Sequence, residues 1–459
     1  MKIIVFCTPE RIRKEAHRAH WPRRSKILAA LFAMACFLIT VPQAGSREQP
    51  QTGPTAVQQQ DTAPLLSQAD QVLKEMSLLT GLPIKSPVKK KVVSRPEVRE
   101  LLIHNLHTDY TPAQIHVQEA TLRAFGLISK SFDMEKFLIS FYTEQAAGFY
   151  DPHTQTMYIA DWIPPDMQKM VLAHELTHAL QDQNFDLEHY MRAVQKDDDA
   201  EAARQAVVEG YATAAMFQNM LGGAQLSNLP SFDEVLGPLI RQQMTEFPVF
   251  AKAPFFFRLQ ALFPYIQGAS FIEQGLRRAD WKSLNVLFTS PPTSTKAISQ
   301  PDVYFNHVSL PAVQLPRPTP LSSVPGLKML DENTLGELGF NALLGQFLSE
   351  DRAKADSSGW MADRYIVYED RATQSYALAA RTRWANSEAA LTFFRDYHSV
   401  LTQKYPELSP DSRSTAERFI GHTASGEIVM LRAGDEVRWA EGVPSDRVDA
   451  MAKWLASLQ

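Results

Sequence analysis

The sequence predicts an α+β protein that is mainly helical, with one small β element near its centre and a second at its C-terminal end. Apolar residues recur at spacings of three and four along residues 165–184, which is typical of a helix with one buried face, and residues 200–221 are alanine-rich and helix-compatible. Two short strand-like segments flank a turn at residues 151–155, and after residue 360 strands and helices follow in the order ββαββα. We therefore expect a mainly helical domain over residues 65–310, with a β-hairpin beside its central helix, and a small α+β module over residues 335–459.

The N-terminal segment predicts export. An apolar run over residues 27–41 follows the basic residues Arg23, Arg24 and Lys26, and small residues suited to cleavage come after it. These 15 residues are too few for an ordinary membrane span and suit the core of a signal peptide. We predict a signal peptide over residues 1–46, a periplasmic or extracellular location, and a disordered linker over residues 47–64. The alternative is an uncleaved N-terminal membrane anchor.

Cysteine usage and charge exclude two classes of site in the exported chain. Cys7 and Cys36 both precede the predicted cleavage point, so neither a disulfide nor a thiolate site is expected after it. Removing the eight basic and two acidic residues of the first 46 from the totals of 46 and 51 leaves 38 basic and 49 acidic residues, a net charge of −11. So acidic a protein is a poor partner for nucleic acid, and we expect none.

Regular structure is expected from about Leu65. Ser94-Arg95-Pro96-Glu97 is a capping box that opens one helix, and Thr111-Pro112 opens the next. Residues 147–150 and 156–160 flank the turn and predict a β-hairpin. The hairpin precedes a helix that begins near Pro165 and extends to about residue 184.

That helix carries the pentad His174-Glu175-Leu176-Thr177-His178. Residues four apart lie on the same face of a helix, so His174 and His178 can bind one metal ion together. Glu175 lies beside them and can accept a proton from a metal-bound water, as a zinc peptidase requires. The alternative is a buried helix whose histidines are hydrogen-bonded core residues; the neighbouring hairpin and carboxylates favour the metal site.

A catalytic zinc ion needs a third protein ligand. The chain has Gln181 and Asn184 where the pattern H-E-x-x-H-x-x-G-x-x-H needs glycine and histidine, which excludes that class. Glu209 is the best candidate, because its apolar neighbours make an unpaired carboxylate costly; an exposed helix position is the alternative. Glu201 is the reserve, and Asp182 is disfavoured because it lies a further turn along the histidine helix.

With these residues in place, the sequence resembles the gluzincin-type zinc metallopeptidases, and in particular a poorly characterised group of exported bacterial proteins. The resemblance rests on the zinc motif and on short runs near it, namely GFYDP (148–152), HELTHALQDQ (174–183) and VEG (208–210), and extends more weakly through 264–268, 291–295 and 359–360. It implies a zincin-like fold for the helical domain, zinc held by His174, His178 and Glu209, and Glu175 as the general base. Tyr211 and Lys296 depart from the group, which often has an acidic residue at each position.

Residues 247–281 are rich in aromatic side chains and predict helices that pack under the metal site; a hydrophobic substrate cleft is the alternative. Tyr211 lies two residues after Glu209, about 200° round the helix, so it is a poor donor to a developing oxyanion. Tyr265 is free of that geometric objection, and we predict that it is the donor. The alternative is a tyrosine packed in the aromatic core.

Five prolines over residues 311–325 predict a Pro-rich linker, which we place at residues 311–334. The module that follows shows no catalytic constellation, so a structural or substrate-positioning role is expected. Its predicted strands and helices are strands at 364–368, 375–381, 428–431 and 436–440, and helices at 387–404 and 445–458.

Two functions from different classes agree with these features. The first is an exported zinc metallopeptidase that hydrolyses peptide or protein substrates through a zinc-activated water, with Glu175 as general base. The second is a catalytically inactive protein of the same zincin fold that serves as a binding or envelope-scaffold module. Glu175 favours the first, because a purely structural zinc site has no need of a general base.

Overall fold

A computed structural model describes residues 63–194, 197–222 and 224–458. The predicted signal peptide and nearly all of the predicted linker at 47–64 lie outside the described residues. Within the described part of the chain, no helix is both long and apolar enough to cross a membrane.

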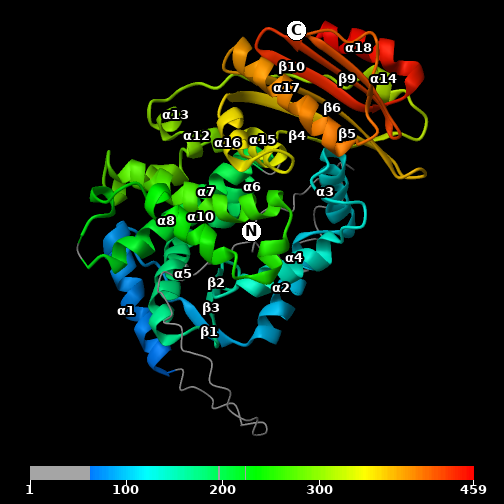
Figure 1. Ribbon diagram of the computed structural model, residues 1–459. Helices are drawn as coiled ribbons and strands as arrows, with labels where there is room; N and C mark the ends of the chain where they lie inside the picture. The colour runs from blue at the N-terminus through cyan, green and yellow to red at the C-terminus, as the bar shows by residue number, and fades with distance from the viewer. Residues whose placement is uncertain (1–62, 195–196, 223, 459) are drawn as a thin grey trace, which may run out of the picture.

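The protein is an α+β structure, as the sequence predicts, with a helical body and two separate β-sheets (Figure 1). The helices of the body are α1 (Ala63–Thr80), α2 (Arg95–Asp109), α3 (Pro112–Phe125), α4 (Met134–Gln145), α5 (Pro165–Phe185), α6 (Leu187–Arg192), α7 (Asp198–Met220), α8 (Phe232–Met244), α9 (Pro248–Lys252), α10 (Phe255–Leu276), α11 (Trp281–Leu284), α12 (Thr295–Ser299) and α13 (Pro301–Phe305). Helix α14 (Thr319–Ser322) lies against the larger of the two sheets. In the described part of the chain, 3-10 turns are present at η2 (Leu226–Asn228), η3 (Asn285–Phe288) and η4 (Ser445–Arg447). The capping box predicted at Ser94 is present at the start of α2, and α3 begins after Thr111 as predicted, with a capping box of its own.

The smaller sheet lies beside α5. It has the order β1-β3-β2 and consists of β1 (Lys89–Val93), β2 (Gly148–Asp151) and β3 (Thr156–Ala160). Strands β2 and β3 form the predicted hairpin, whereas β1 pairs in parallel with β3 and was not predicted. Exposed and less exposed residues alternate along β1, and the exposed ones are Lys89 and Lys91. In the sequence, a run of lysines indicates a solvated segment and gives no sign of a strand.

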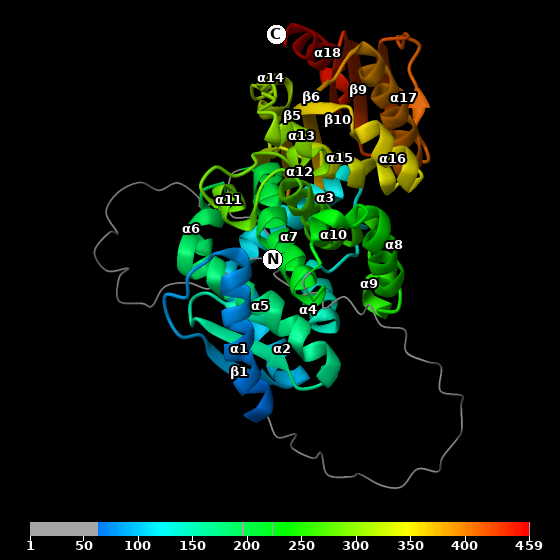
Figure 2. The ribbon, with the colours of Figure 1, turned by 90° about the vertical axis from the view of Figure 1, so that its left-hand side faces the viewer.

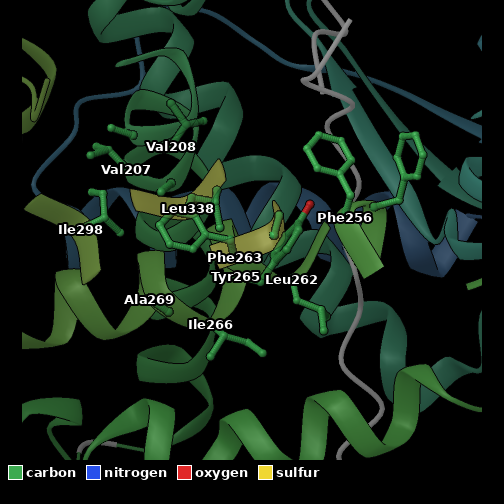
Figure 3. Packing of buried hydrophobic residues seen from close by; sticks show 14 of the residues in the cluster. Val207, Val208, Phe256, Leu262, Phe263, Tyr265, Ile266, Ala269, Ile298 and Leu338 are labelled. Atoms are coloured by element: carbon green, nitrogen blue, oxygen red, sulfur yellow. The ribbon is translucent and has the colours of Figure 1, made fainter. Parts of the chain in front are cut away.

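Helices α5, α7 and α10 form the centre of the body, and α1 packs along α5 (Figure 2). Figure 3 shows side chains of α10, among them Leu262, Phe263 and Ile266, packed with Val207 and Val208 of α7. The aromatic segment predicted to form helices is mainly α10, and Phe256, Phe257, Phe263 and Phe271 are all buried there.

The larger sheet is antiparallel, with the order β4-β5-β6-β10-β9-β8-β7. Its strands are β4 (Lys328–Asn333), β5 (Trp360–Asp370), β6 (Ser375–Trp384), β7 (Ser409–Pro410), β8 (Arg418–Thr423), β9 (Gly426–Ala433) and β10 (Glu436–Val443), and the helices of this region are α15 (Gly336–Gly345), α16 (Glu350–Ser357), α17 (Ser387–Lys404) and α18 (Val448–Ser457). Alternate residues of the strands point to opposite faces, one covered by α17 and the other by α18 and α14.

The sheet is larger than the four strands predicted. Elements β5, β6, α17, β9, β10 and α18 occupy the predicted segments, but β4, β7 and β8 are additional. The region predicted as a Pro-rich linker contains both α14 and β4, and its Leu315 and Leu321 are buried under the sheet. The prolines of this region interrupt the periodicity by which a strand or helix is recognised in a sequence, but they do not prevent Leu315 and Leu321 from packing in the core. The domain boundaries at residues 310 and 335 stay predictions, and one hydrophobic cluster runs from α1 to β10.

Candidate metal centre

Helix α5 brings two histidine side chains together. The rings of His174 and His178 are 4.7 Å apart between centroids, and their Nε2 atoms are 3.0 Å apart. Both residues are buried. This is the arrangement expected for residues four apart on one helix face.

Glu209 reaches the same point from α7. Its Oε2 atom lies 3.2 Å from His174 Nε2 and 3.4 Å from His178 Nε2, and the side chain is fully buried. One ligand atom of each of the three residues lies within 4.8 Å of the others, and this is the single such group of three or more His, Cys, Asp or Glu residues in the described part of the chain. The structure therefore brings together His174, His178 and Glu209, as the sequence predicts.

The two other candidate ligands lie elsewhere. Glu201 is not a member of the group, although it is also buried on α7. Asp182 accepts hydrogen bonds from the hydroxyl of Tyr150 and the backbone N–H of Leu187, both at 3.1 Å, so it joins α5 to β2 and to the start of α6. The sequence disfavours Asp182 as a metal ligand, and its position in the structure agrees with that.

Two glycines allow α7 to pack closely against α10 beside Glu209. Helices α7 and α10 cross at Gly210 and Gly268, where a Cβ atom on Gly268 would lie 2.3 Å from the backbone oxygen of Ala206. A Cβ atom on Gly210 would lie 2.2 Å from the backbone of Gly268. Only glycine fits at such a crossing, and the contact fixes the axial position of α7 next to Glu209.

Glu175 lies on α5 against the hairpin. Its side chain is 1% exposed, and its Oε1 atom has no hydrogen-bond partner among the described residues. Gly148 of β2 lets the hairpin pack this closely on α5, because a Cβ atom there would lie 2.8 Å from Val171 Cγ1 and 3.6 Å from Glu175 Cγ. Burial raises the pKa of Glu175 to about 8, and the charge of His178 and the backbone N–H of Tyr150 oppose that rise in part.

The charges in this group are strongly coupled. Burial alone favours the neutral imidazole, and it lowers the pKa of His174. For His178 burial is the largest single effect and lowers the pKa, but the charge and hydrogen bond of Glu209, the charge of Glu175 and the hydrogen bond to Gln181 together outweigh it and raise the pKa to about 9. For Glu209 burial raises the pKa, but His178 and His174 outweigh it and lower the pKa to about 2.

Gln181 also belongs to this site, and sequence reasoning missed it. Its Oε1 atom lies 2.8 Å from His178 Nδ1, and its Nε2 atom donates to the backbone oxygen of Val208 at 3.1 Å. The sequence showed only that Gln181 cannot be the glycine of a three-histidine motif. Its position at i+3 from His178 is the signal that could have identified it.

The donor set fits a metal ion. Two imidazole nitrogens and one carboxylate oxygen converge in a buried site, and this combination suits a divalent transition metal with one position left open. Glu209 Oε1 and Glu175 Oε1 are both buried without a hydrogen-bond partner in the described structure. Buried carboxylate oxygens are rarely left in that state, so the chemistry of these atoms fits a site that binds a cation.

Tyr265 lies next to the histidines. Its ring is 6.1 Å from the ring of His174 between centroids, with 29° between the two planes, and the residue is 4% exposed. Figure 3 shows its hydroxyl oxygen pointing away from Ile266 and Ala269. Tyr211 instead donates to Asn285 Oδ1 at 2.9 Å, as its position on α7 predicts. Of the two tyrosines considered, only Tyr265 lies beside the metal ligands.

Comparison with known proteins agrees with this geometry. Residues 108–215, which include all four residues of the predicted zinc site, match a family described as "Putative metallopeptidase family (DUF6782)". Residues 325–452 match a "Domain of unknown function (DUF8575)". The first match supports a metallopeptidase, and together with the buried group it supports a metal-dependent hydrolase.

Two further comparisons give little. No curated protein matches the chain. Among solved structures, the chain is similar to the "putative hydrolase with a novel fold from Chloroflexus aurantiacus", with a TM-score of 0.35 and 16% identity over 55% of this chain and 92% of that chain.

Proposed function

We propose that this protein is a zinc-dependent metallopeptidase of the gluzincin type, in which His174, His178 and Glu209 hold the ion. One observation carries the proposal: the three side chains converge in a buried site that also contains a second carboxylate, Glu175, with an oxygen that no described residue binds. The match of residues 108–215 to a metallopeptidase family supports the same class.

A zinc ion bound here supplies a Lewis acid that activates water and polarises the carbonyl group of the substrate. Glu175 then acts as the general base, because its free oxygen can take the proton of the attacking water and deliver it to the leaving amine. The carboxylate has few donors of its own, so it stays basic enough for this task. Burial, which raises its pKa, works in the same direction.

Tyr265 is proposed as the donor that stabilises the oxyanion formed when water attacks the carbonyl. Its ring lies against that of His174, so it is placed beside the ion-binding group on the α10 side. The Gly210–Gly268 crossing holds α10 in place one turn from Tyr265. A hydroxyl in such a position can donate a hydrogen bond to the oxyanion that develops in the transition state of peptide hydrolysis.

We further propose that the enzyme is exported and acts on peptides or proteins outside the cytoplasm. The apolar run at 27–41 and the absence of cysteine after Cys36 support export. The net negative charge supports a protein substrate over nucleic acid.

The test compares the wild-type chain with Glu175→Gln. We expect both proteins to hold about one zinc ion per chain, and only the wild type to cleave a denatured protein substrate. Glu135→Gln, on the exposed side of α4, is the matched control and should cleave like the wild type. A wild type that binds zinc but cleaves none of a panel of peptides and unfolded proteins would instead support the binding or scaffold function.

A further inference from the structure

Gln181 lies one turn after His178 on α5 and is fully buried. A buried amide needs partners for both of its ends, and Gln181 has them. One end meets His178, which the proposed function assigns to the metal ion, and the other meets the backbone of α7 at Val208, the residue before Glu209. Gln181 therefore links a histidine of α5 to the backbone of α7.

The partners of Gln181 determine which end of its amide faces each of them. The backbone oxygen of Val208 can only accept a hydrogen bond, so the atom of Gln181 that faces it must be the amide nitrogen. The amide oxygen therefore faces His178 Nδ1 at 2.8 Å, and it too can only accept. Nδ1 of His178 must carry the hydrogen.

This assignment determines what the other ring nitrogen can do. When Nδ1 carries the hydrogen of a neutral imidazole, the lone pair resides on Nε2. The Nε2 atom is the one that lies 3.4 Å from Glu209 Oε2 and 3.0 Å from His174 Nε2. The hydrogen bond to Gln181 thus directs the lone pair toward the point at which the three side chains converge.

The second hydrogen bond joins the two helices that carry the ligands. Gln181 belongs to α5 with both histidines, and Val208 directly precedes Glu209 on α7. One side chain therefore restrains the ring of His178 and the backbone next to Glu209 at once. Such a restraint reduces the reorganisation needed when an ion binds.

We propose that Gln181 is a positioning residue for the metal site: it holds His178 as the Nδ1–H tautomer and ties that ring to the backbone that carries Glu209. The proposal rests on the proposed function only in that it needs a metal ion at this site. It assigns Gln181 no contact with the substrate.

The experiment measures the zinc dissociation constant of the full chain by competition with a chelator, for the wild type and three variants. Gln181→Met fills the same space without a hydrogen-bond acceptor, and we expect it to weaken zinc binding about 10- to 100-fold. Gln181→Glu keeps an acceptor for Nδ1 but cannot donate to Val208, so we expect its zinc affinity to fall between those of the wild type and Gln181→Met.

Gln183→Met is the matched control. Gln183 lies on the same helix and also bonds to backbone, with Lys85 and Ser86, but it does not contact the metal ligands. Its zinc affinity should stay within about twofold of the wild type, although the protein loses stability. A Gln181→Met protein as tight as this control, or a Gln181→Glu protein as weak as Gln181→Met, would overturn the proposal.

A second measurement needs no variant. In the zinc-loaded wild type, the ¹⁵N spectrum should show His178 with a hydrogen on Nδ1 and the metal on Nε2. Zinc bound through Nδ1 would disprove the proposal even if Gln181→Met failed to fold. Zinc binding without peptide cleavage would reject the proposed peptidase but leave the role of Gln181 standing, so the two failures can be told apart.

Discussion

Helix α7 contains a buried carboxylate near its start and another at its middle, and the two regions differ in how their carboxylates are satisfied. Near its start, Asp199 accepts from the backbone N–H of Thr295 at 2.9 Å and from the hydroxyl of the same residue. Close by, Asp363 accepts from Leu335, Gly336 and Trp360, and Glu337 accepts from Lys296 and Gln300. We call this group, Asp199, Thr295, Lys296, Glu337 and Asp363, the polar joint.

At the metal centre, in contrast, Glu175 and Glu209 each keep one buried oxygen with no described partner. Both regions are acidic and buried, so burial of acid alone does not indicate a binding site. The difference lies in the donors. The polar joint supplies N–H and O–H groups from the chain itself, whereas the metal centre leaves the position open, as a site for an external cation must.

The strongest test of this contrast removes one cationic partner from each region. His178→Ala should reduce zinc from about one ion per chain to nearly none, because a carboxylate and one imidazole seldom hold zinc alone. Lys296→Met should keep the zinc but lower the free energy of unfolding by about 3 kcal/mol, because Glu337 then remains buried without its charged partner.

Metal analysis and chemical denaturation of both variants check this pair. Zinc loss in Lys296→Met would show that the polar joint and the metal centre are one functional unit, and the comparison would fail.

The next largest effect is expected where α7 packs against α10 at Gly268. Gly268→Ala places a methyl group within 2.3 Å of the backbone oxygen of Ala206, and a backbone atom cannot move aside as a side chain can. We expect a loss of about 3 kcal/mol in the free energy of unfolding, and weaker zinc binding because α7 carries Glu209.

Gly275→Ala is the control on the same helix. Its new methyl group would meet side-chain atoms of Leu284 and Phe305, which can adjust. Its stability should change by about 1 kcal/mol or less, with zinc affinity unchanged. Equal effects of the two substitutions on zinc affinity would mean that the helix crossing does not position Glu209.

Tyr265→Phe separates catalysis from structure at the metal centre. Loss of one oxyanion donor should lower turnover by roughly 10- to 1000-fold while zinc binding and stability remain close to those of the wild type. The measurement is steady-state cleavage of a peptide by the zinc-loaded protein. Unchanged turnover would assign Tyr265 to the aromatic core around α10.

The sequence predicted the grouping of His174, His178 and Glu209 better than it predicted the rest of the molecule, for a physical reason. His174 and His178 are related by the helical repeat alone, and the apolar neighbours of Glu209 already showed that its carboxylate needs a partner. The role of Gln181 depends on a hydrogen bond to Val208, 27 residues away, and on which end of the amide faces which helix. No local pattern contains that information.

The fold shows the same division. Hairpin β2–β3 and helices α5, α7 and α10 follow from periodicity and turn residues. Strand β1 was missed because its lysines resemble a solvated run, and β4 because the prolines before it suggest a linker. Both strands form by pairing with partners far along the chain: β1 with β3, and β4 with β5. Long-range pairing of this kind leaves little trace in a single sequence.

The smallest expected effect is a pH dependence that belongs to the polar joint. Burial raises the pKa of Asp199 to about 6, and its hydrogen bonds from Thr295 oppose that rise only in part. An acid whose pKa is higher in the folded state binds more protons there than in the unfolded chain. Its contribution to stability is therefore fully present below its ordinary pKa of 3.8 and is lost as the pH rises through about 6.

Asp199→Asn removes this titration and keeps an oxygen that can accept both hydrogen bonds from Thr295, since both go to the same atom, Oδ1. Between about pH 4.5 and 6.5, the free energy of unfolding of the wild type should fall by about 2 kcal/mol relative to that of the variant. Denaturant unfolding across this range measures the difference. It should appear with and without zinc, because Asp199 does not belong to the metal-binding group. A difference between the two proteins that stays constant with pH would mean that Asp199 is ionised throughout the range, held by its donors as firmly as Glu209 is held by the histidines.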